Sequence, residues 1–388
     1  MRILNILHRS VPISRYGPEV AVPPALDTSI VAVVTDQRVG SEPLIGFGFA
    51  SIGRFAQGGL IGDRFAPRLL RANPCALMHS DGVAIDPLKA WSIMMAGEKA
   101  GGHGERSVAV GVLDMAIWDL AAKAREVPLF QLIRQVFGRP ATRDRVPVYA
   151  GGGYVFPNNE FACLRDEALR FRAMGVQAMK MKVGTCDLAF DCKRIETVLE
   201  VFGAGDSLAV DAMNAYSPRR AHEAATALEP YQLKWFEDVC DPLDFETHRR
   251  LAAFYRPPIS AGEAIFSASD ARNLLRYAGL RKGHDVLTFD PAHCYGVPEY
   301  ARIIELFEEE GWTTGDFQPH GGHLYSLHLA IGLGLGGSEC NPHNFQPFGG
   351  FADGAKIVDG EAAPPDIPGI GFESRNSLMD LFRSLVRS

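Results

Sequence analysis

The strongest constraint on the fold of this 388-residue chain is a repeated alternation of short apolar and longer amphipathic segments that begins at Val146. The short segments have the length of buried parallel strands, and the longer ones, such as 268–277 and 297–310, have helical periodicity. Eight βα units of this kind close into a barrel. We therefore predict an α/β fold, a modified TIM-type (β/α)8 barrel, with strands at 146–151, 177–183, 207–212, 233–238, 258–263, 285–290, 313–319 and about 337–339.

The N-terminal third lacks this alternation and has an α+β pattern. Strand-like segments come first and helical segments follow, at 2–8, 27–36 and 44–50, and then at 61–72, 86–97 and 105–125. A chain of this length exceeds what one hydrophobic core usually serves. We therefore predict an N-terminal α+β domain at 1–140, a barrel with the catalytic site at 141–350, and a C-terminal segment at 351–388 that packs back on the N-terminal domain.

Composition excludes several classes of protein. The net charge of −7 argues against nucleic acid or an anionic membrane as a partner, and no apolar run is long enough to span a bilayer. The seven scattered cysteines include no CxxC pair, and the first ten residues do not resemble a signal peptide, so we expect a cytoplasmic protein with reduced thiols. An anionic substrate must then be bound by locally placed cations.

Three acidic residues end neighbouring strands of the predicted barrel. Asp211, Glu237 and Glu263 are separated by 237 − 211 = 26 and 263 − 237 = 26 residues, which is one βα unit each. A single acidic residue at a strand end often caps the next helix, but three at equal spacing converge on the catalytic rim of a barrel. Converging carboxylates repel one another unless a cation neutralises them. We therefore predict a metal site for Mg²⁺, or for Mn²⁺ as the second choice.

Two lysines lie in one otherwise apolar strand. Lys180 and Lys182 are two residues apart, so their side chains point to the same face. Burying two lysines in a barrel is unfavourable unless they reach a polar site, although an exposed edge strand is the alternative explanation. A nearby ammonium and a divalent cation would lower the pKa of a lysine towards neutrality. We expect Lys182 to be a base and Lys180 to bind a substrate carboxylate.

The far side of the predicted barrel supplies an acid. Asp290 and His320 end the sixth and seventh strands, and Glu339 follows the eighth. An aspartate on an adjacent strand can orient an imidazole and stabilise its charged form. A structural histidine is the commoner role for a single residue, and the sequence HGGH at 320–323 could suggest zinc, but no HxH or HExxH motif supports that. A base and an acid on opposite sides fit removal of a proton α to a carboxylate.

These residues together resemble the enolase superfamily, in its mandelate racemase-like branch. The resemblance covers essentially the whole chain, and it implies a capping domain over a modified barrel, one Mg²⁺ on Asp211, Glu237 and Glu263, and a homo-oligomer. Within that branch, several stretches are similar to the D-tartrate dehydratases: 53–60, 98–111, 269–277, 318–323, 332–337 and 345–354.

The resemblance implies a small-molecule carboxylate as substrate and a dehydration as the reaction. Lys182 would remove the C2 proton, His320 with Asp290 would protonate the leaving C3 hydroxyl, and Lys99 would bind the distal carboxylate, so that D-tartrate would give oxaloacetate. The loop at 13–26 has few of the polar residues expected for tartrate. A dehydratase of another aldonate or aldarate, and a racemase or epimerase acting through the same two groups, are therefore the alternatives.

Overall fold

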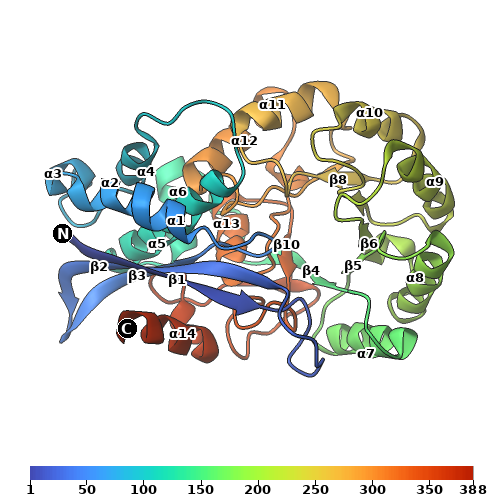
Figure 1. Ribbon diagram of the computed structural model, residues 1–388, viewed down its shortest axis with the longest axis horizontal. Coiled ribbons are helices and arrows are strands. Elements are labelled where there is room, and N and C mark those ends of the chain that lie inside the picture. Colours follow the sequence, from blue (N-terminus) through green and yellow to red (C-terminus); the bar gives the residue numbers. More distant parts are fainter. Residues whose placement is uncertain (388) are drawn as a thin grey trace.

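The N-terminal domain is built on a three-stranded antiparallel sheet (Figure 1). The computed structural model describes residues 1–387. The strands of the sheet are β1 (Ile3–Ile13), β2 (Leu26–Val39) and β3 (Glu42–Phe49), longer than the sequence pattern predicted. Residues 28–33 of β2 are all buried, because helices cover both faces of the sheet. The helical segments that follow the sheet in the chain are α1 (Gly58–Leu60), the π-helical turn η1 (Ile61–Phe65), α2 (Ala66–Arg71), α3 (Pro74–Leu77), α4 (Pro87–Met95), α5 (Glu105–Ala124) and α6 (Leu129–Phe137).

Helix α5 joins the N-terminal domain to the barrel. The sequence predicted one buried stripe, but the helix is buried on almost every side from Ser107 to Ala122, because it lies between the sheet and the barrel. The close approach requires Gly111, at which a Cβ would lie 1.8 Å from the carbonyl oxygen of Ala292. This contact fixes α5 against the segment that follows Asp290.

The barrel has the predicted α/β architecture. Its parallel strands run in the order β10-β4-β5-β6-β7-β8-β9. They are β4 (Val146–Gly152), β5 (Met179–Lys182), β6 (Leu208–Asp211), β7 (Phe236–Glu237), β8 (Ile259–Ala261), β9 (Val286–Leu287) and β10 (Ser338–Cys340). The surrounding helices are α7 (Glu160–Ala173), α8 (Leu188–Phe202), α9 (Pro218–Leu228), α10 (Phe245–Phe254), α11 (Ala268–Tyr277), α12 (Val297–Glu309) and α13 (Leu324–Leu333), with short 3-10 turns η2 (Gly205–Ser207) and η3 (Glu229–Tyr231).

The prediction of a regular seventh strand at 313–319 is wrong. Residues Thr314–Asp316 form a 3-10 turn, η4, because Thr313 and Asp316 satisfy each other's backbone in a capping box. Phe317 is extended and forms a single parallel bridge with Leu287. The backbone N–H of Gly336 donates to the carbonyl oxygen of Phe317 at 2.9 Å, so the ring is completed through this irregular segment.

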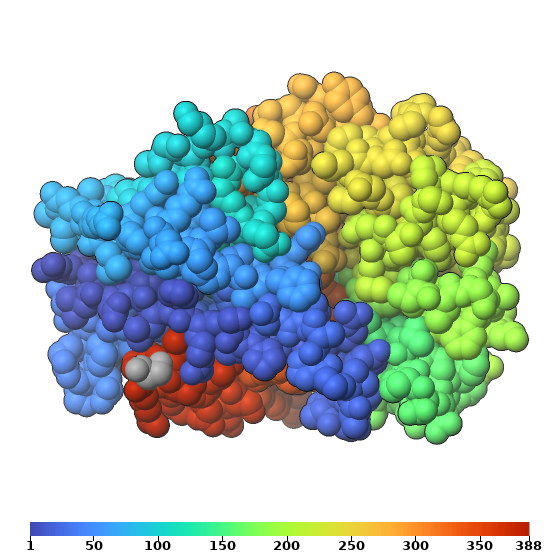
Figure 2. Space-filling model, viewed as in Figure 1, coloured from blue at the N-terminus to red at the C-terminus, as the bar shows by residue number. Residues whose placement is uncertain are grey.

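The C-terminal segment returns to the N-terminal sheet. Strand β11 (Glu361–Ala362) pairs with the start of β4, and the turn η5 (Phe372–Ser374) leads into α14 (Asn376–Arg387). Helix α14 lies against β1 and β2, with the ring of Phe382 stacked on that of Phe47 at 4.7 Å between centroids. Figure 2 shows this red segment directly beneath the blue N-terminal strands. The domain limits at residues 140 and 350 stay predictions.

Two sequence expectations bear on the whole chain. All seven cysteines are free thiols, as expected. In the part of the chain that the structure describes, no helix combines the length and the apolar character needed to cross a membrane.

Candidate active site

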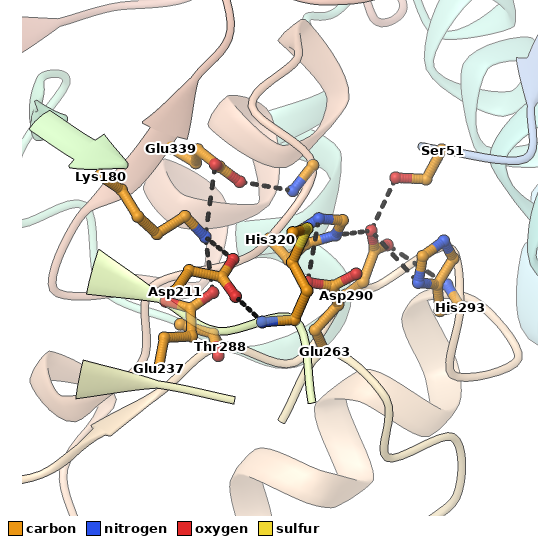
Figure 3. Close-up of polar contacts among 12 residues, drawn as sticks. Ser51, Lys180, Asp211, Glu237, Glu263, Thr288, Asp290, His293, His320 and Glu339 are labelled. Atoms are coloured by element: carbon orange, nitrogen blue, oxygen red, sulfur yellow. Dashed lines mark hydrogen bonds and ion pairs between the residues drawn. The ribbon is translucent and has the colours of Figure 1, made fainter. Parts of the chain in front are cut away.

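The three predicted carboxylates converge at the carboxyl ends of the strands. Asp211 ends β6, Glu237 ends β7, and Glu263 lies two residues beyond β8. Asp211 and Glu237 are register partners in adjacent parallel strands, which places their side chains side by side. One oxygen of each of the three carboxylates lies within 4.8 Å of the others (Figure 3). The regular spacing in the sequence thus becomes a compact cluster of oxygen atoms.

Lys180 compensates part of this negative charge. Its side chain is fully buried, with Nζ 2.5 Å from Glu237 Oε1 and 3.4 Å from Glu339 Oε1. Burial lowers the pKa of Lys180, but the charges of Glu237 and Glu339 outweigh burial and hold the pKa well above its usual value. Lys180 is therefore a permanent cation of the site.

Lys182 lies beside Asp211. The two side chains form a close ion pair, and Lys182 Nζ also lies 5.5 Å from the ring centroid of Tyr154. The sequence suggested a lowered pKa for Lys182. In the structure, burial and the charge of Lys180 both lower the pKa of Lys182. The charge of Asp211 acts in the opposite direction, and the net result is a raised pKa. A divalent cation on Asp211 would compete for that carboxylate and weaken the effect.

The donor set fits a hard divalent cation. Asp211, Glu237 and Glu263 offer only carboxylate oxygens, the ligands that Mg²⁺ prefers. Burial raises the pKa of Glu237 despite Lys180, and the charge of Asp211 adds to the rise. The pKa of the adjacent Asp238 is also raised, by burial first and by Glu263 next. Burial is the first cause of both rises, whereas Lys182 and Lys180 hold the pKa of Asp211 below its usual value despite its burial. A bound cation would stabilise the charged form of the buried Glu237 in the same way.

His320 and Asp290 form a buried pair. His320 Nδ1 lies 2.7 Å from Asp290 Oδ2, and its Nε2 lies 3.4 Å from Glu263 Oε2. Burial alone would lower the pKa of His320, but the charge of Glu263 and the hydrogen bond to Asp290 raise it to about 9. The imidazole is therefore protonated at neutral pH, with Nε2 directed towards the carboxylate cluster.

A hydrogen-bonded chain behind this pair was not found from the sequence. Ser326 N–H donates to His323 Nδ1 at 3.2 Å, which leaves the hydrogen of His323 on Nε2, 3.0 Å from Ser51 Oγ. Ser51 in turn donates to Asp290 Oδ2 at 2.6 Å (Figure 3). The signal for His323 was the second histidine of the 320–323 motif, but nothing in the sequence connected Ser51 to it.

A cavity of about 250 Å³ is lined by four of the predicted residues, whereas Lys180, Asp211, Glu237 and Asp290 are not among its lining residues. Lys182, Glu263, His320 and Glu339 line it, together with residues that the sequence analysis did not assign to the site: Arg15, Leu26, Ile52, Gly53, Arg54, Gly151, Gly152, Tyr154, Met213, Asn214, Asp238, Asn341 and Phe345. Lys99 is exposed and is not among the lining residues. The cations that the N-terminal domain contributes are therefore Arg15 and Arg54.

Comparison with known proteins identifies the family. A protein-family model described as "Enolase C-terminal domain-like" matches residues 163–378. The chain belongs to the enolase superfamily. This membership confirms the resemblance that the sequence suggested, whereas the closer similarity to D-tartrate dehydratases is not established by it.

Several relatives of this enolase superfamily member are named for reactions of sugar acids. The present chain is 30% identical, over 72% of each chain, to 3,6-anhydro-alpha-L-galactonate cycloisomerase from Streptomyces coelicolor. It is 27% identical, over 76% of its own length and 70% of the relative's, to L-talarate/galactarate dehydratase from Salmonella typhimurium. A crystal structure of L-talarate dehydratase from Polaromonas sp. JS666, complexed with Mg and L-glucarate, is 26% identical with a TM-score of 0.70, covering 95% of this chain and 94% of that one.

Proposed function

We propose that this enolase superfamily member is a Mg²⁺-dependent dehydratase of a hydroxy acid of the acid-sugar class. The observation that carries the proposal is the position of Lys182 and His320, which line one cavity from the second and seventh positions of the barrel. The three carboxylates come from the third, fourth and fifth positions between them. A base and an acid that flank a metal site are the groups that β-elimination from an α-hydroxy acid requires.

The reaction begins with removal of a proton from C2 of the substrate. Lys182 Nζ accepts that proton in its neutral form and becomes an ammonium ion. Lys180, buried beside Glu237 and Glu339, pairs with the substrate carboxylate, whose negative charge increases as the enediolate forms. Asp211, Glu237 and Glu263 would hold the Mg²⁺, which would supply electrostatic stabilisation of that charge. The neighbouring Glu339 pairs with Lys180 and accepts the backbone N–H of Gly321 at 3.1 Å, next to His320.

The hydroxyl at C3 leaves on the opposite side. His320 Nε2 gives its proton to that oxygen, the C3–O bond breaks, and water departs. Asp290 holds the imidazole through Nδ1 and stabilises the charged form that delivers the proton. The remaining enol tautomerises to a 2-keto acid. We propose D-tartrate as the substrate, which would yield oxaloacetate, and an aldonate or aldarate of another length as the alternative.

A racemase or epimerase is the second candidate. Lys182 and His320 reach the cavity from different sides, so a proton removed at one face of C2 could be returned at the other without loss of water. The contact of Asp290 Oδ2 with His320 Nδ1 favours the dehydratase, because it stabilises the charged imidazole that would protonate a leaving hydroxyl. We also propose that the protein is a homo-oligomer located in the cytoplasm.

The test is a 2-keto acid assay of the Mg²⁺-loaded protein with D-, L- and meso-tartrate and with longer aldonates and aldarates. Appearance of a keto acid with loss of one water supports the proposal, and D-tartrate as the preferred substrate supports the specific assignment. The same panel is incubated in D₂O and followed by NMR. Exchange or inversion at C2 without loss of water would favour the racemase, and the absence of both reactions for every acid would contradict the proposed function.

A further inference from the structure

Two cationic side chains in the cavity have no anionic partner. Arg15 and Arg54 are both half-buried, and among residues 1–387 neither forms an ion pair or a hydrogen bond through its guanidinium. Arg54 Nε is buried without any partner. By contrast Arg194, which is fully buried, is paired with Asp191 and Glu160. Arg15 and Arg54 line the cavity without a partner, so their N–H groups are available to an anionic ligand.

Arg15 lies on the side of Lys182. The guanidinium carbon of Arg15 lies 5.5 Å from the ring centroid of Tyr154, and Lys182 Nζ lies at the same distance from that ring. The two cations are therefore separated by no more than twice that distance. The aromatic ring holds Arg15 by a cation–π contact and leaves its N–H groups available.

Arg54 lies on the side of His320. Its guanidinium carbon is 4.6 Å from the ring centroid of Phe266, which neighbours the ring of His293, and His293 in turn lies 5.6 Å from His320. The preceding residue, Gly53, is close to the metal site, since a Cβ there would lie 3.2 Å from Glu263 Oε1. Arg54 is thus held by Phe266 and lines the same cavity as Arg15.

We infer that Arg15 and Arg54 bind a second carboxylate at the far end of the substrate, so that the enzyme selects dicarboxylic acids over the corresponding monocarboxylic acids. A guanidinium presents parallel N–H donors that match a carboxylate, and the apolar side chains of Leu26 and Ile52 in the same cavity reduce the competition from water. This inference rests on the proposed function, because it extends the substrate away from Lys182 and His320. It also assigns binding of the distal carboxylate, which the resemblance implied for Lys99, to Arg15 and Arg54.

The experiment compares acids that differ only at one end. Each diacid is paired with the acid in which one carboxylate is a primary alcohol: D- and L-tartrate with the threonates, and galactarate with galactonate. Dissociation constants are measured by calorimetry with the Mg²⁺-loaded Lys182→Ala chain, which would not consume the ligands, and kcat/KM is measured with the unchanged chain. The variants are Arg15→Gln, Arg54→Gln, Arg54→Lys, Lys99→Gln and, as a matched surface control, Arg71→Gln.

The expected result is tighter binding of the diacid, with a preference that falls about tenfold or more in Arg54→Gln and in Arg15→Gln. Arg54→Lys keeps the charge without the paired donors and should retain part of the preference, and Arg71→Gln should retain all of it. Folding of each variant is checked by circular dichroism.

Several outcomes would overturn the inference. These are equal or better binding of the monoacid by the parent, an unchanged preference in both arginine variants, loss of the preference in Lys99→Gln instead, or a stronger preference for a phosphorylated aldonate. Because binding does not require turnover, a diacid preference without any dehydration would contradict only the proposed reaction. Absence of binding by every acid would overturn both.

Discussion

Ser51 of the N-terminal domain donates a hydrogen bond of 2.6 Å to Asp290 of the barrel, the carboxylate that holds His320 (Figure 3). The same oxygen, Asp290 Oδ2, accepts from both Ser51 Oγ and His320 Nδ1. Ser51 has a φ of 57°, a conformation that is uncommon for a residue with a side chain. The N-terminal domain therefore does more than cover the cavity, because one of its residues orients the acid pair.

Ser51→Ala should reduce kcat about tenfold, because loss of a hydrogen bond to a buried charged group weakens the positioning of Asp290. The dissociation constant for Mg²⁺ should not change, since Ser51 does not contact the three carboxylates. Steady-state kinetics and calorimetry test the two statements. Ser10→Ala, which removes a hydrogen bond from an exposed serine to Asp27, is the matched control and should keep the parent kcat. An unchanged kcat in Ser51→Ala would contradict the positioning role.

Lys182→Ala should lower kcat by at least ~10²-fold, the contribution of a well-placed general base. It should also stop exchange of the C2 proton in D₂O, whereas Mg²⁺ binding should persist because Asp211 is retained and loses its competing ion pair. Stopped assays and NMR exchange measure the effect. Lys193→Ala, an exposed lysine on α8, is the control. Substantial residual turnover would remove Lys182 from the role of base.

Glu263→Gln should weaken Mg²⁺ binding by more than the ~10–100-fold that loss of an outer-shell partner produces. Glu263 is the best choice of the three carboxylates because, within residues 1–387, its one ion pair is with His320, so the change breaks neither lysine pair. Calorimetric titration of Mg²⁺ into the metal-free parent and variant chains measures this loss of affinity. Glu309→Gln on α12 is an exposed control. Equal affinity in Glu263→Gln and the parent would argue against the proposed ligand set.

The free energy of unfolding should fall as the pH drops below ~6.5 because His328 is buried in its neutral form. Its Nδ1 accepts from Phe130 N–H and its Nε2 donates to the carbonyl of Ile370, and burial lowers its pKa to about 3. Since the folded pKa is below the unfolded value, the unfolded chain binds more protons between pH ~6.5 and about 3. The stabilisation is therefore present above ~6.5 and decreases by up to ~1.4 kcal/mol per pH unit on acidification.

Urea unfolding of the parent and His328→Gln at pH 7, 6, 5 and 4 tests this dependence. The difference in unfolding free energy between the two chains should shrink as the pH falls, since other titrating groups are common to both. His222→Gln, at an exposed histidine on α9, should keep the parent slope. Parallel curves for the parent and His328→Gln would show that His328 does not carry the effect.

Local patterns in the sequence determined the architecture and the groups that carry the proposed chemistry. The period of the βα units fixed which residues end the strands, and in a parallel barrel all of these ends meet at one rim. For that reason Lys180, Asp211, Glu237, Asp290 and Glu339 come together as expected. Several predicted strands were too long, such as 285–290, of which β9 spans Val286–Leu287. The prediction failed at 313–319, where Thr313 and Asp316 form a turn.

The tertiary structure alone decided which residues of the N-terminal domain reach the site. Arg15, Ser51 and Arg54 lie in loops, and no periodicity relates a loop residue to a barrel strand more than 100 positions away. The same limit affected Lys99, which resemblance placed at the substrate and which the structure places on the surface. The direction of the pKa shift of Lys182 could not be predicted from the sequence either, because it depends on the balance between burial and the charge of Asp211. Spacing along strands specifies the barrel groups, but packing between domains specifies what they act on.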